Sequence, residues 1–95
     1  MIIRFIIAPM DHRPGPAPPL DRILARLLLG GATDLCAVRA LGWVVGHAPS
    51  GGVFELHYWP TRGYAVERRR QPSQRAERLG VFSSWTEAVD RALRA

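Results

Sequence analysis

The hydrophobic pattern of the chain begins with a short apolar run at residues 2–8, which Arg4 alone interrupts. A brief run rich in isoleucine and phenylalanine is typical of a strand that is buried on both faces. Residues 13–19 follow and contain four prolines. Proline fits neither a sheet ladder nor a helix interior, so we expect an extended surface connection there.

The clearest helical pattern follows this connection. Its apolar residues recur with the spacing of one helix face, and they are Leu20, Ile23, Leu24, Leu27 and Leu28. Gly30 and Gly31 predict the end of this helix. Residues 33–41 fit two interpretations: a second short helix capped by Thr33 and Asp34, which we favour, or a strand that leads into Trp43.

Strand patterns dominate the next part of the chain. Residues 43–48 and 53–59 flank a Pro-Ser-Gly-Gly sequence, which predicts a hairpin. If the hairpin folds symmetrically about Ser50 and Gly51, one face is apolar and is expected to face the core: Trp43, Val45, His47, Phe54, Leu56 and Tyr58. The other face then carries Glu55, His57 and Trp59. A shift of one residue in the register would change these assignments.

The carboxyl-terminal part continues with a turn at 60–63, a third strand at 64–70 and a short apolar piece at 79–82. Ser84 and Glu87 have the spacing of a capping box, which predicts a final helix with Val89, Ala92 and Leu93 on its apolar stripe. We therefore predict a single α+β domain over residues 1–95. Its mainly antiparallel sheet has about four strands, with helices packed on one face.

Residues 79–93 read Leu-Gly-Val-Phe-Ser-Ser-Trp-Thr-Glu-Ala-Val-Asp-Arg-Ala-Leu. This segment resembles the sheet-plus-helix ending of ethylene-response-factor DNA-binding domains and of integrase amino-terminal arms. The resemblance implies a helix packed on a sheet that itself lies on DNA. The first forty residues have no counterpart in those domains.

Composition narrows the class of protein. Hydrophobic residues make up 47% and charged residues 22%, as in ordinary globular domains. The lone Cys36 excludes an intramolecular disulfide and a cysteine-based zinc site, and we expect a buried thiol in a cytoplasmic protein. The apolar run near the amino terminus is too short for a signal peptide or a membrane span, so we expect no membrane association.

The net charge of +5 results from 13 basic and 8 acidic residues, and all 13 basic residues are arginine. The absence of lysine fits either a coding bias or selection for planar guanidinium donors. Five arginines crowd into one strand end and loop: Arg68, Arg69, Arg70, Arg75 and Arg78. Such a cluster is either a solvated surface or a site for phosphate contacts. Tyr58 and Trp59 lie nearby and could stack on bases.

We therefore predict a non-enzymatic binding module that binds nucleic acid or nucleoprotein through these arginines. The alternative is a protein-interaction or inhibitor domain, of the type found in phages and mobile elements, that binds an acidic protein. No catalytic residue and no cofactor are predicted. Glu55 and His57 have a spacing that could begin a metal site, but the sequence offers no third ligand, so no metal is predicted. A helix-turn-helix over 20–41 and an enzyme site shared between subunits are weaker alternatives.

Overall fold

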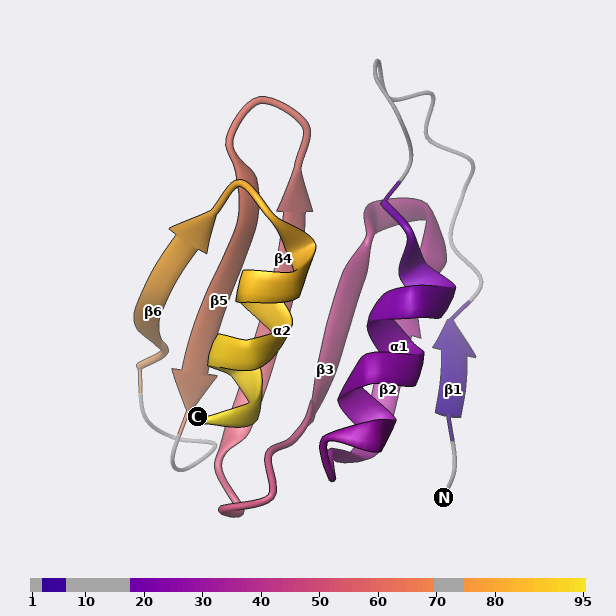
Figure 1. Ribbon diagram of the computed structural model, residues 1–95, viewed down its shortest axis with the longest axis vertical. Helices are drawn as coiled ribbons and strands as arrows, with labels where there is room; N and C mark the ends of the chain where they lie inside the picture. The colour runs from indigo at the N-terminus through magenta and orange to yellow at the C-terminus, as the bar shows by residue number, and fades with distance from the viewer. Residues whose placement is uncertain (1–2, 7–17, 70–74) are drawn as a thin grey trace.

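The computed structural model describes residues 3–6, 18–69 and 75–95, and it has an α+β fold (Figure 1). Within these residues, six strands lie in one sheet in the order of the sequence. They are β1 (Ile3–Ile6), β2 (Thr33–Val38), β3 (Trp43–His47), β4 (Val53–Trp59), β5 (Gly63–Arg69) and β6 (Glu77–Phe82). The strand β1 pairs with β2 in parallel, and β2 to β6 form an antiparallel meander. The sheet therefore has more strands than the four or so expected.

Both helices cover the same face of the sheet (Figure 1). The helix α1 (Leu20–Leu29) connects β1 to β2, and α2 (Trp85–Leu93) follows β6. On α1 the buried residues are four of the five in the predicted apolar stripe, Leu20, Ile23, Leu24 and Leu27, while Leu28 is half-buried. On α2 they are Ala88, Val89 and Ala92, whose small side chains let the helix approach the sheet closely. The predicted packing of helices on one sheet face is confirmed.

The segment 33–41 is a strand followed by the short 3-10 helix η1 (Arg39–Leu41), so the favoured helix is wrong here. The reason is its position in the sheet, because β2 pairs with β1 on one side and with β3 on the other. Leu35 and Ala37 alternate toward the helices and are fully buried. A helix-turn-helix over 20–41 is excluded by the same observation.

The register of the β3–β4 hairpin differs from the symmetric prediction. Trp43 pairs with His57, and His47 pairs with Val53. Gly51 adopts a φ of 96°, and its N–H donates to the carbonyl of Ala48. The loop is therefore the three-residue type that ends in a left-handed glycine, rather than a two-residue turn.

This register reverses half of the predicted core face. Phe54 and Leu56 do face the helices and are fully buried, together with Val44. Trp43, Val45 and His47 lie on the opposite face, with Glu55, His57 and Trp59. The face without helices is therefore much more aromatic than the sequence interpretation implied.

The proline-rich connection predicted over 13–19 lies mostly outside the described residues. Within the described part of the chain, no helix is long and apolar enough to cross a membrane.

Candidate functional site

Among the described residues, both helices lie on one face of the sheet, and we call the other face the open face. It consists of the side chains that alternate away from the helices on the three central strands. These are Trp43, Val45, His47, Val53, Glu55, His57, Trp59, Ala65, Glu67 and Arg69. Most of them are half-buried, and Ala65 is fully buried. Aromatic, acidic and basic groups thus share one accessible surface.

Trp59 on the open face lies among guanidinium groups. The Cζ atom of Arg78 is 4.9 Å from the centre of the indole ring, and that of Arg62 is 5.7 Å from it. These distances are typical of cation–π contacts, which attract a cation to the electron-rich face of a ring. Arg78 reaches Trp59 from β6, whereas Arg62 lies in the β4–β5 turn. The pattern therefore positions positive charge next to a flat aromatic surface.

Trp43 stacks on His57, with ring centroids 5.5 Å apart and an interplanar angle of 26°. Between this pair and Trp59 lies an open depression of about 280 Å³, which Leu41 and Tyr58 also line. A flat ring can stack on indole and imidazole surfaces of this kind.

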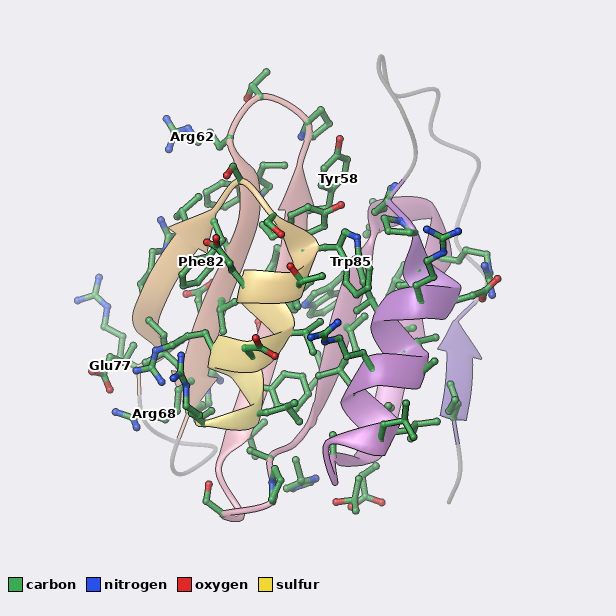
Figure 2. All side chains as sticks on the ribbon, in the orientation of Figure 1. Tyr58, Arg62, Arg68, Glu77, Phe82 and Trp85 are labelled. Carbon is green, nitrogen blue, oxygen red and sulfur yellow. The ribbon has the colours of Figure 1, made fainter. Side chains whose placement is uncertain are left out.

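The structure separates the arginines that the sequence groups together. Arg69 belongs to the open face, but Arg68 alternates to the helix side, where its guanidinium donates to Glu77 at 2.6 Å. Figure 2 shows Arg68 beside Glu77 at the end of the sheet opposite the turn that carries Arg62. Arg75 is exposed just before β6, and Arg70 lies outside the described residues. Among the predicted arginines that the structure describes, Arg78 contacts Trp59.

Tyr58 points toward the helix side of the sheet, unlike its neighbour Trp59. Its ring lies 5.0 Å from the ring of Tyr64 on β5, at an interplanar angle of 41°. Burial, and to a lesser extent the neighbouring Tyr58, raise the pKa of Tyr64 above its ordinary value of 10.0. This tyrosine pair is thus part of the packing between sheet and helices, although Tyr58 also lines the depression.

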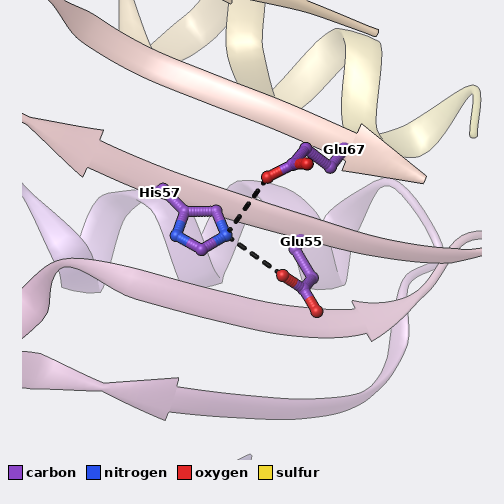
Figure 3. A group of neighbouring side chains, drawn as sticks. All are labelled: Glu55, His57 and Glu67. Carbon is purple, nitrogen blue, oxygen red and sulfur yellow. Dashed lines mark hydrogen bonds and ion pairs between the residues drawn. The ribbon is translucent and has the colours of Figure 1, made fainter. Parts of the chain in front are cut away.

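A compact group of side chains lies at the centre of the open face (Figure 3). The Nε2 atom of His57 is 3.1 Å from a carboxylate oxygen of Glu55 and 3.7 Å from one of Glu67. Glu55 and His57 project from the same strand, as expected, and Glu67 lies directly opposite Glu55 on β5. All three side chains are half-buried, at 27%, 27% and 22% exposure respectively. The three potential ligand atoms lie within 4.8 Å of one another.

His47 and Cys36 also differ from expectation. His47 was expected in the core, but its side chain is 44% exposed, and its Nδ1 atom lies 3.3 Å from a carboxylate oxygen of Asp34. Cys36 is half-buried rather than fully buried. Both residues alternate away from the helices.

Sequence reasoning missed three of the residues that this surface brings together. Trp43 was assigned to the core through the wrong register, and Arg62 was treated only as part of a turn. Glu67 was not considered as a partner of His57. The signal for Glu67 is the Pro60–Gly63 turn, because pairing the strands around that turn places Glu67 opposite Glu55.

Comparisons of the chain with known protein families, with curated proteins and with solved structures found no match. The resemblance of residues 79–93 to DNA-binding domains stays a prediction.

Proposed function

We propose that the chain is a non-enzymatic module that binds single-stranded nucleic acid on its open face. The observation that carries this proposal is the position of Trp59 on that face, in contact with the guanidinium groups of Arg62 and Arg78. Bases stack on exposed tryptophan, and arginines beside the ring can contact the flanking phosphates.

Other features of the open face support the same function. Trp43 and His57 offer a second stacked aromatic pair, and the depression between them and Trp59 leaves room for a flat ring. Arg69 adds a further guanidinium on the same face. A single strand fits better than a duplex, because its bases are free to stack on protein side chains.

The molecule contains a matched control for this proposal. Trp85 on α2 also has an arginine over its ring, with Arg26 Cζ 6.0 Å from the ring centre. This second pair lies on the helix side of the sheet (Figure 2). The two tryptophan–arginine pairs have similar chemistry but lie on opposite sides of the protein.

The experiment measures fluorescence anisotropy of a labelled single-stranded oligonucleotide, with the duplex as competitor, at several salt concentrations. Trp59→Leu should weaken binding about 5- to 150-fold, since stacking of one base contributes about 1–3 kcal/mol. Trp85→Leu should leave the affinity within about twofold of the unchanged chain. Arg78→Ala should lower the slope of log K against log salt by about 0.7, and Arg26→Ala should not. Absence of binding at low salt, or equal losses in the two tryptophan variants, would refute the proposal.

An acidic protein partner is the second candidate, and it has an observation of its own. The strand β6 is the last in the sheet order, so among the described strands it pairs on one side only, with β5. Val81 on this strand is 43% exposed and lies close to Arg78 in the sequence. Arginine is enriched at protein interfaces, and a partner can add a strand to an exposed sheet edge. This function is favoured if neither oligonucleotide binds and the chain forms a stoichiometric protein complex that Val81→Asp abolishes.

A further inference from the structure

The two glutamates at the centre of the open face form an unfavourable pair. Glu55 and Glu67 are direct cross-strand partners on β4 and β5, and both are only about one-quarter exposed. Like charges directly opposite each other destabilise a sheet. The imidazole of His57, which carries a charge only when it is protonated, lies within 3.7 Å of both carboxylates. Arg78 is the cross-strand neighbour of Glu67 on β6, and its guanidinium extends to the ring of Trp59. The sheet therefore positions a pair of carboxylates that a bound cation would stabilise.

The donor atoms already have the spacing of a zinc site. Zinc bonds of about 2.0–2.1 Å to nitrogen and oxygen place tetrahedral ligands about 3.3 Å from one another. The Nε2 atom of His57 lies 3.1 Å from the Glu55 oxygen and 3.7 Å from the Glu67 oxygen. The three potential ligand atoms lie within 4.8 Å of one another, so the two carboxylate oxygens need to approach each other by at most about 1.5 Å to match this spacing.

Two further features fit a bound metal. Glu55 and His57 are two residues apart on β4 and Glu67 is on its paired neighbour, so the register of the sheet fixes the backbone of all three. The ring of Trp43 stacks on His57 and restricts the orientation of the imidazole. We propose that Glu55, His57 and Glu67 bind one Zn²⁺ ion on the open face.

The choice of zinc follows from the donor set. One imidazole and two carboxylates suit zinc better than magnesium or calcium, which prefer all-oxygen sites. Three protein ligands leave one tetrahedral position for water or another small ligand. This proposal goes beyond nucleic-acid binding, and its test involves no nucleic acid.

The test is calorimetric titration of the tag-free, chelator-treated chain with ZnCl₂, with MgCl₂ as the comparison titrant. We expect one zinc per chain and no heat of binding with magnesium. Glu67→Gln keeps the size of the side chain and should raise the dissociation constant at least tenfold. His57→Phe keeps a ring against Trp43 but removes the nitrogen ligand, and it should have at least the same effect. Far-UV circular dichroism checks that each variant is folded.

His47 provides the matched control. It lies on the same face and has its own carboxylate neighbour in Asp34, but it is not part of the proposed site. His47→Phe should bind zinc with unchanged stoichiometry and affinity. Unchanged binding in Glu67→Gln, loss of binding in His47→Phe, or no zinc binding by the unchanged chain would each overturn the proposal. If His57→Phe does not fold, Glu67→Gln alone decides the question, since it alters neither the stacking nor the size of the site.

Discussion

Substitution of Gly46 tests which face of the sheet is open, and the functional proposals depend on that assignment. A Cβ atom at Gly46 would lie 2.5 Å from Leu35 Cδ2 and 3.0 Å from Phe54 Cζ. Favourable carbon–carbon contacts are about 3.5–4.0 Å. Leu35 and Phe54 are both fully buried, so neither side chain can move into solvent. Gly46 is therefore a place where the ring of Phe54 fills the space of a missing side chain.

The expected cost of Gly46→Ala follows from two opposing effects. Overpacking a well-packed core costs about 1–3 kcal/mol. Loss of backbone freedom in the unfolded chain offsets about 0.4–1 kcal/mol of this cost. The middle of both ranges gives a net loss of about 1.3 kcal/mol, which should lower Tm by about 5–10 °C in a domain of this size. In the symmetric register predicted from the sequence, Gly46 would face solvent, and the same substitution would be neutral or stabilising.

Urea denaturation followed by circular dichroism measures this effect. Two neighbouring valines provide the comparison, because Val44 is fully buried on the helix side and Val45 is half-buried on the open face. Val44→Ala should therefore cost more than Val45→Ala. The double variant Gly46→Ala/Phe54→Leu should lose at least about 0.5 kcal/mol less free energy of unfolding than the sum of the losses in the two single variants. A stabilising Gly46→Ala together with the reverse order of the valines would refute the assigned register.

Two further predictions concern pH and helix capping. Because the pKa of Tyr64 is raised by burial, the folded state disfavours its phenolate, and the stability present below pH 10 should be lost as the pH rises through the raised value. The chain contains no lysine, so urea midpoints at alkaline pH should show this loss clearly, and Tyr64→Phe should reduce it. Ser84 caps α2 by accepting the Thr86 N–H at 3.3 Å, so Ser84→Ala should lower the free energy of unfolding by about 1 kcal/mol, and Ser84→Gly by less. Equal urea midpoints for Ser84→Ala and the unchanged chain would contradict the assigned cap.

The sequence predicts both helices correctly, because their apolar spacing and terminal residues are sufficient to identify them. The helix α1 follows from apolar spacing and a terminal Gly-Gly pair, and α2 follows from its Ser84 cap. The α+β fold class and the packing of both helices on one face of the sheet follow from the order of the predicted helices and strands. Residues 33–38 were assigned wrongly because their pattern fits a helix or a strand, and pairing with β1 and β3 decides between them. That pairing is a property of the tertiary structure.

The open face was harder to predict because it depends on one turn. Pro49, Ser50 and Gly51 form a loop of odd length, and a two-residue loop would have placed Trp43 on the other side of the sheet. The contact of Arg78 with Trp59 joins residues from β6 and β4, and it too requires the assembled sheet. The sequence analysis grouped Arg68 with Arg78 because they are close in the sequence. In the structure, Arg68 instead forms an ion pair with Glu77 on the helix side of the sheet.

The proposed zinc site and the proposed nucleic-acid surface lie on the same face of the sheet, so the charge at one affects binding at the other. Glu55 and Glu67 place two carboxylates at the centre of the open face, whose arginines lie around them: Arg62 in the β4–β5 turn, Arg69 at the end of β5 and Arg78 on β6. Without a cation, these carboxylates repel a phosphate backbone that crosses the centre, and they favour a path along Trp59, Arg62 and Arg78. A bound Zn²⁺ would neutralise the pair and extend the favourable surface toward the Trp43–His57 stack. The metal would thus determine how much of the open face a nucleic acid can occupy.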